Sequence, residues 1–216
     1  MNKLLCPSLM CADYRELANT VKVLDEAGID IFHCDIMDGN FVPNITMGLM
    51  DVKAVRASTN KLVDCHLMIE NPSEKVDWFI DAGADIIYIH YEADEKVKET
   101  LQHIHERGKK AGLAINPETQ LEDVKDLLED CDYILVMSVH PGFSGQKFIK
   151  ETDDKVKQFI QIQKDYSYKI VVDGGCSPAV IERLSAVGVN GFVLGSASLF
   201  GKDKSYSEII KELRKL

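Results

Sequence analysis

A histidine and an aspartate lie two residues apart in the apolar run at residues 31–37, which is followed closely by a glycine. Successive side chains of a β-strand point to opposite faces, so His33, Asp35 and Met37 share one face. Imidazole and carboxylate groups bind divalent metals in proteins, and a carboxylate is also a common proton-transfer group. This face of the run is therefore a candidate for metal binding and acid–base chemistry.

Two further strand-like runs carry the same kinds of side chain. The run at 62–68 has His66 two residues before Met68, and the run at 169–173 ends in Asp173 ahead of two glycines. Each residue alone has an ordinary explanation, since a lone histidine often packs in a core and an aspartate before glycine often forms a turn. All of them stand where a strand meets a glycine or a loop, so we interpret them together as a metal site with two carboxylates available for proton transfer. The four candidate ligands are His33, Asp35, His66 and Asp173.

Composition sets the class of protein. The 216 residues are 45% hydrophobic, which is enough for a large core and within the size range of a single-domain α/β barrel. The formal charge of −10 and the lack of a basic block argue against nucleic acid and anionic membranes as partners. No apolar run approaches the ~18 residues of a membrane span, and no export signal is evident, so we expect a cytoplasmic protein. The six cysteines lack CxxC spacing and lie mostly in apolar runs, which favours reduced, buried thiols.

Strand and helix signals alternate along the whole chain. Short apolar runs predict eight strands, and segments of helical period, such as 14–27 and 71–82, lie between them. A short motif in which a glycine ends a helix and a strand follows occurs three times, which indicates a weak internal repeat. This order predicts one α/β domain over residues 1–216, a (β/α)8 TIM barrel. The predicted strands are 4–8, 31–37, 62–68, 85–90, 111–115, 133–138, 169–173 and 191–195.

Glycines gather at the expected C-terminal ends of the last three strands. Barrels of this type carry their chemistry at that end and often bind phosphate in the loops after strands seven and eight. Backbone N–H groups can approach an oxyanion closely at glycine, and we expect a helix N-terminus at Gly195 to add positive potential. A single glycine pair would be an ordinary turn, but three groups beside the candidate metal site indicate a phosphorylated substrate. The groups lie at 141–146, 173–175 and 195–196.

The motifs taken together closely resemble the ribulose-phosphate 3-epimerase family, from the first strand to the last. The matching motifs are Pro7-Ser8, His33-x-Asp35-x-Met37-Asp38-Gly39, Phe41-Val42-Pro43-Asn44, His66-Leu67-Met68, Pro141-Gly142-Phe143-x-Gly145-Gln146, Asp173-Gly174-Gly175 and Gly195-Ser196.

The resemblance implies an enzyme that inverts C3 of a ketose phosphate through an enediolate. His33, Asp35, His66 and Asp173 would bind one divalent metal ion, and Asp35 and Asp173 would move protons on opposite faces of the substrate. The ligand types suit Zn²⁺, Fe²⁺, Co²⁺ or Mn²⁺ without choosing among them. We also expect a homo-oligomer. The substrate-binding residues implied are Ser8, Met37, His66, Met68, Met137, Gly142, Phe143, Ser144, Gly145, Gly174, Gly175, Gly195 and Ser196.

Departures from the family pattern bear on substrate length. Cys11, Cys65 and Cys176 replace the residues usual in ribulose-phosphate epimerases, and residues 116–119 and 198–200 also look like the related D-allulose-6-phosphate 3-epimerases. Gly175 and the stretch 138–140 look like the ribulose enzymes instead. We therefore expect conversion of D-allulose 6-phosphate to D-fructose 6-phosphate, with D-ribulose 5-phosphate to D-xylulose 5-phosphate as the alternative.

Other functions on the same fold fit less well. A Schiff-base aldolase needs a lysine near the C-terminal end of a strand, whereas Lys3, Lys61 and Lys169 stand at strand beginnings. The Asp-x-Lys-x-x-Asp spacing of orotidine-phosphate decarboxylases does not occur in the sequence. A non-catalytic phosphosugar-binding barrel is a remote alternative, because binding alone would not need two metal-ligating carboxylates.

Overall fold

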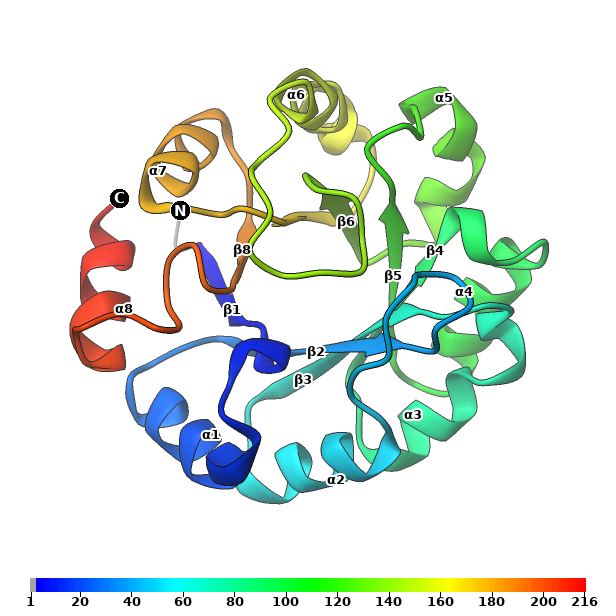
Figure 1. Cartoon of the computed structure of the whole chain (residues 1–216). Helices are drawn as coiled ribbons and strands as arrows, with labels where there is room; N and C mark the ends of the chain where they lie inside the picture. Colours follow the sequence, from blue (N-terminus) through cyan, green and yellow to red (C-terminus); the bar gives the residue numbers. More distant parts are fainter. Residues whose placement is uncertain (1–2) are drawn as a thin grey trace.

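The computed structural model describes residues 3–216 and confirms the (β/α)8 barrel. Eight parallel strands form one sheet in the order β1-β8-β7-β6-β5-β4-β3-β2, and the helices surround it (Figure 1). Between β1 and β2, the N–H of Asp30 donates to the carbonyl of Leu5, and Ser8 pairs with His33 in a parallel bridge. These contacts close the barrel. Both faces of the strands are covered, which explains their nearly continuous apolar sequence.

All eight predicted strands are present, with ends that differ from the prediction by one residue at most. The strands are β1 (Leu4–Pro7), β2 (Ile31–Met37), β3 (Leu62–Met68), β4 (Ile86–His90), β5 (Lys110–Ile115), β6 (Tyr133–Met137), β7 (Lys169–Asp173) and β8 (Gly191–Leu194). The helices are α1 (Leu17–Glu26), α2 (Leu49–Ser58), α3 (Val76–Ala82), α4 (Val97–Glu106), α5 (Leu121–Val124), α6 (Thr152–Ile162), α7 (Pro178–Val187) and α8 (Tyr206–Lys215). Within residues 3–216, no helix combines the length and the apolar content needed to cross a membrane.

The core consists of two apolar layers separated by the strands. Inward-facing side chains such as Tyr88 and Leu135 fill the barrel, whereas outward-facing ones such as Phe32 and Val63 pack against the helices. Five of the six cysteines are buried and Cys11 is partly buried; all six are free thiols, as predicted. The polar side chains of the candidate site share the inward-facing parity of the barrel interior, so they lie at the end of a well-packed cylinder.

The segment after β8 differs from the prediction. We expected a helix to begin at Gly195, but residues 196–201 form a hydrogen-bonded turn instead. In this turn the N–H groups of Leu199 and Phe200 both donate to the carbonyl of Gly195, at 2.9 and 3.2 Å. The chain then passes through Gly201 in a left-handed conformation (φ 70°), and α8 begins only at Tyr206. The end of β8 therefore meets a tight turn, not the N-terminus of a long helix.

Candidate metal centre and adjoining pocket

Strand pairing brings the predicted polar side chains to one end of the barrel. The register between β2 and β3 places Asp35 opposite His66, and the register between β6 and β7 places Met137 opposite Asp173. All these residues lie at or near the C-terminal ends of their strands. The spacing in the sequence and the parallel pairing thus bring side chains more than a hundred residues apart to the same end of the barrel.

The four predicted ligands form one compact cluster. One ligand atom each from His33, Asp35, His66 and Asp173 lies within 4.8 Å of the other three. Asp35 Oδ1 is 3.2 Å from His33 Nε2 and 3.3 Å from His66 Nδ1. Asp173 Oδ2 is 3.7 and 3.6 Å from the same two nitrogens. Four bonds of about 2.1 Å in a tetrahedron would place the ligand atoms about 3.4 Å apart. The donor types and their separations therefore fit one divalent cation.

Each histidine of the cluster has a buried partner on its second ring nitrogen. His33 Nδ1 lies 2.7 Å from Oδ1 of Asp64, and His66 Nε2 lies 2.8 Å from Nε2 of His90. Sequence analysis missed both partners. His90 ends β4, so the strand-end argument that selected the four ligands could also have found it. Asp64 lies within β3 and gives no such signal.

The two aspartates of the cluster hold protons very differently. Burial alone would raise the pKa of Asp35, but the neighbouring His33 and His66 outweigh burial and lower that pKa. Burial, and then the negative charge of Asp35, raises the pKa of Asp173 to about 7. Burial lowers the pKa of His66 to about 3. The cluster therefore pairs an ionised carboxylate with a neighbour that can carry a proton near neutral pH, an arrangement suited to acid–base chemistry.

A cavity of about 260 Å³ opens beside the cluster. Asp35 and Asp173 reach this cavity, whereas His33 and His66 are fully buried behind them. His66 is therefore the one predicted substrate-binding residue that does not line the cavity. The predicted residues that do line it are Ser8, Met37, Met68, Met137, Gly142, Phe143, Ser144, Gly145, Gly174, Gly175, Gly195 and Ser196.

Ser8 contacts the cluster itself. Its hydroxyl donates a hydrogen bond of 2.5 Å to Asp35 Oδ2, and its side chain is buried. The other oxygen of Asp35 faces His33 and His66. Ser8 thus holds one carboxylate oxygen in place while the second oxygen faces the two histidines of the cluster.

The glycines after β7 allow two loops to pack closely at the cavity. Gly175 has a left-handed backbone (φ 59°), and a Cβ atom there would lie 2.6 Å from the backbone nitrogen of Phe148. A Cβ atom on Gly174 would lie 2.5 Å from a side-chain carbon of Val139. A larger residue at either position would force the loop after β6 away from the end of β7.

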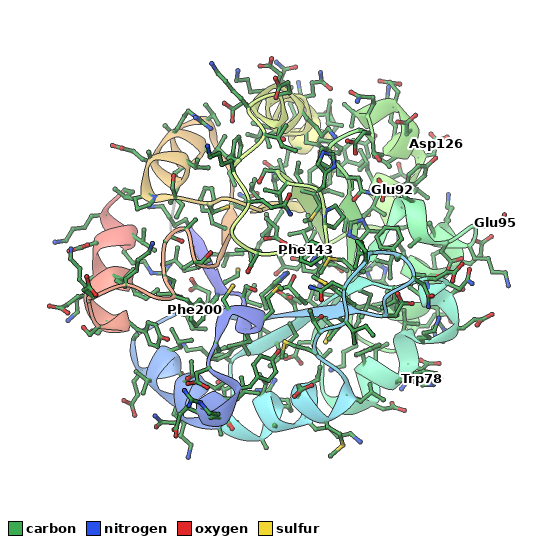
Figure 2. All side chains as sticks on the ribbon, in the orientation of Figure 1. Trp78, Glu92, Glu95, Asp126, Phe143 and Phe200 are labelled. Carbon is green, nitrogen blue, oxygen red and sulfur yellow. The ribbon has the colours of Figure 1, made fainter. Side chains whose placement is uncertain are left out.

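The loop after β6 forms the outer wall of the cavity. Gln146 donates to the carbonyls of His140 and Phe143, and Asn44 donates to the carbonyl of Gly142, which links this loop to the one after β2. Phe143 lies over the centre of the barrel in Figure 2, with 54% of its surface exposed. Among the described residues that line the cavity there is no lysine or arginine. An anion in this cavity must therefore be held by N–H groups and hydroxyls.

Comparisons with known proteins agree with this geometry. The sequence profile described as "Ribulose-phosphate 3 epimerase family" matches residues 4–199. A ribulose-phosphate 3-epimerase from Synechocystis is 43% identical to this chain, and the alignment covers 99% of the chain and 94% of that relative. The Bacillus subtilis enzyme of the same name is 40% identical, with coverages of 95% and 97%. Among solved structures, a 3-keto-L-gulonate-6-phosphate decarboxylase from Vibrio cholerae has a TM-score of 0.76 at 13% identity, covering 100% of this chain and 97% of that one. That likeness concerns the fold alone.

Proposed function

The chain belongs to the ribulose-phosphate 3-epimerase family, and from that premise we propose that it interconverts D-ribulose 5-phosphate and D-xylulose 5-phosphate. It is a ketose-phosphate 3-epimerase, an isomerase that acts on a carbohydrate phosphate. The relatives that support the pentulose substrate are named ribulose-phosphate 3-epimerases and align over nearly the whole chain. They favour the alternative drawn from the sequence over the expected hexulose phosphate.

The positions of the three departing cysteines weaken the case for a hexulose phosphate. Cys65 belongs to the apolar layer between strands and helices and does not line the cavity. Cys176 lines the cavity, but its thiol is buried and directed to the carbonyl of Val172, at 3.5 Å. Cys11 also lines the cavity, and of the three cysteines it alone is partly exposed. Two of the three cysteines that differ from the usual ribulose-phosphate epimerase residues are therefore explained by packing.

The observation that carries the proposal is the pair of carboxylates with opposed proton affinities at the cavity. We assign Asp35 as the base that removes the C3 proton and Asp173 as the acid that returns a proton to the opposite face, with the roles exchanged in the reverse direction. The negative charge of Asp35 is one cause of the raised pKa of Asp173. Once Asp35 takes up a proton, this charge is lost, and Asp173 releases its own proton more easily.

The cluster fits a divalent cation, which His33, Asp35, His66 and Asp173 would hold. When bound, such an ion stabilises the negative charge that develops on the ketose oxygens as the C3 proton leaves. Two histidines and two carboxylates suit Zn²⁺, Fe²⁺, Co²⁺ or Mn²⁺. His33 and His66 are fully buried behind the carboxylates and do not line the cavity, so the protein's proton-transfer groups remain the two aspartates.

The phosphate group would bind at the glycine-rich rim of the cavity. Gly145, Gly175, Gly195 and the hydroxyl of Ser196 belong to the loops after β6, β7 and β8, and all line the cavity. Backbone N–H groups and hydroxyls are suitable donors for a phosphate, and glycine allows the backbone to approach closely. The methionines Met37, Met68 and Met137 would form an apolar wall near the reacting carbons.

The proposal is tested by assaying the purified, metal-loaded protein on two substrates side by side. We expect kcat/KM for D-ribulose 5-phosphate to exceed that for D-allulose 6-phosphate by about tenfold to a hundredfold, because one additional carbon unit must fit the same metal-to-phosphate distance. A ratio at or below one would assign the enzyme to the hexulose phosphate and leave the chemistry at C3 unchanged.

A further inference from the structure

His66 has two ring nitrogens, and the second one points away from the cluster. Nδ1 faces Asp35 and Asp173, whereas Nε2 lies 2.8 Å from Nε2 of His90. His90 is fully buried at the end of β4, and the two rings stack at 26° with their centroids 5.0 Å apart. Two neutral imidazole nitrogens at this distance share one hydrogen, so one ring donates and the other accepts. The ring that donates determines which nitrogen of His66 keeps a free lone pair.

Glu92, labelled in Figure 2, determines the direction of this hydrogen bond. Its Oε2 lies 3.1 Å from Nδ1 of His90. Burial alone would raise the pKa of Glu92, but its contacts with His90, Thr119 and Asn116 outweigh burial and lower that pKa, so the group is ionised. An ionised carboxylate only accepts hydrogen bonds, so Nδ1 of His90 carries the hydrogen and Nε2 of His90 is bare. His66 has one hydrogen for two contacts, and it donates from Nε2 to His90 at 2.8 Å, the shorter one; Nδ1, which lies 3.3 Å from Asp35 Oδ1, then keeps its lone pair directed at the cluster.

Glu92 is itself held in place by the neighbouring loop after β5. Its Oε1 accepts a hydrogen bond of 2.9 Å from the N–H of Asn116 and a second one from the hydroxyl of Thr119. Lys155 on α6 donates to the carbonyls of Asn116 and Pro117, at 2.7 Å each. These contacts fix the carboxylate from the side opposite His90. Its two oxygens therefore have separate tasks, one on the loop and one on the histidine.

We propose that His90 and Glu92 are positioning residues that keep the hydrogen of His66 on Nε2 and thereby hold Nδ1 free for a divalent cation. This inference rests on the proposed metal-dependent function and names the residues that prepare one ligand for it. His90 and Glu92 do not line the catalytic cavity. They act on the reaction only through His66.

The other histidine of the cluster faces a carboxylate without a residue in between. His33 Nδ1 faces the carboxylate of Asp64 directly, at 2.7 Å, which leaves Nε2 toward the cluster. A carboxylate on the far nitrogen of a metal-binding histidine fixes its tautomer and orientation. For His66 the carboxylate stands one imidazole farther away. The relay of two hydrogen bonds through His90, on β4, fixes the tautomer of His66 in the same way.

The first test is the isosteric substitution Glu92→Gln. The carbonyl oxygen of the new amide can keep the two donors from the loop, and its NH₂ group then faces His90 Nδ1. This arrangement reverses the relay and places a hydrogen on His66 Nδ1, the nitrogen that should bind the metal. The matched control is Glu95→Gln, which removes the same charge from an exposed neighbour in the same surface hollow.

Affinity for Co²⁺ is measured on the metal-free proteins by absorption titration. Loss of the hydrogen-bond partner on the other ring nitrogen of a metal-binding histidine typically weakens metal binding by 10- to 100-fold. We expect a loss of that size in Glu92→Gln and a change of less than about twofold in Glu95→Gln. Equal affinities in the two variants would overturn the inference.

The second test observes the tautomers directly by ¹⁵N NMR of histidine-labelled, metal-free protein. In the wild type we expect the hydrogen on Nδ1 of His90 and on Nε2 of His66. A wild-type His90 with its hydrogen on Nε2 would overturn the relay, even if Glu92→Gln failed to fold. These results are separate from the proposed function, which would instead be refuted if the wild-type protein neither bound Co²⁺ nor epimerised a ketose phosphate.

Discussion

Replacing Ser8 with alanine should slow proton transfer by Asp35 without removing the metal, because the carboxylate is no longer held in position. The hydroxyl of Ser8 donates a 2.5 Å hydrogen bond to Asp35 Oδ2, and both side chains are buried. The other oxygen of Asp35 faces His33 and His66, so the substitution leaves the contacts of the metal cluster intact. Ser8→Ala is therefore a change on one side of a single carboxylate.

The size of the effect follows from the kind of hydrogen bond that is lost. A hydrogen bond to a charged group contributes about 1.5–3 kcal/mol. Each 1.36 kcal/mol of lost transition-state stabilisation corresponds to roughly a tenfold change in rate. If the bond holds Asp35 in its reactive position, kcat/KM should fall by about 10- to 150-fold. Water that enters the space left by the hydroxyl would bring the value toward the lower end.

The assay combines steady-state kinetics with the metal content per protein chain. We expect Ser8→Ala to keep full metal content and to lose mainly kcat. Ser196→Ala is the matched control, because Ser196 lines the same cavity at the proposed phosphate end and should raise KM instead. A normal kcat/KM in Ser8→Ala, or a loss in strict proportion to lost metal, would refute the reasoning.

Three further predictions concern the cluster itself. His33→Ala or His66→Ala should lose metal and activity together, because each removes one of four ligands; full metal content with normal turnover in either variant would disprove the assignment. Asp173→Asn, if folded and metal-loaded, should be inactive as an epimerase yet still exchange the C3 proton of one epimer with solvent, and the two roles would be wrong if Asp35→Asn exchanged the same epimer equally well by NMR. Burial and the charge of Asp35 raise the pKa of Asp173 to about 7, so this acid loses its proton above neutral pH. In the direction that uses Asp173 as the acid, kcat/KM should therefore fall by roughly tenfold per pH unit above pH 7, and a kcat/KM that stays level from pH 7 to 9 would contradict this.

The barrel and the cluster of the four candidate ligands could be predicted because both depend on short-range patterns in the sequence. Alternating strand and helix signals define the order of elements, and parallel strands bring their C-terminal ends to one side. His33 and Asp35 share a face through the two-residue period of a strand. Asp173 could be selected as a candidate from its position at a strand end alone. No knowledge of side-chain conformations entered these predictions.

The partners of the ligands could not be predicted in the same way. The contact between Asp64 and His33 depends on the register between two strands and on the orientation of a ring, and neither is written in the local sequence. Glu92 is linked to His66 only through His90, and it is held in turn by the loop after β5. The expected helix after Gly195 is absent because residues 196–201 form a turn that ends at Gly201, whose backbone is left-handed. Long-range packing determines these features.

The most direct test of the central claim is the reaction of metal-loaded protein with D-ribulose 5-phosphate in D₂O, followed by NMR of the product. Proton removal on one face and return on the other, by carboxylates that exchange with solvent, predicts D-xylulose 5-phosphate that carries deuterium at C3. Product without deuterium at C3, or deuterium uptake without any inversion in the wild-type protein, would contradict the account.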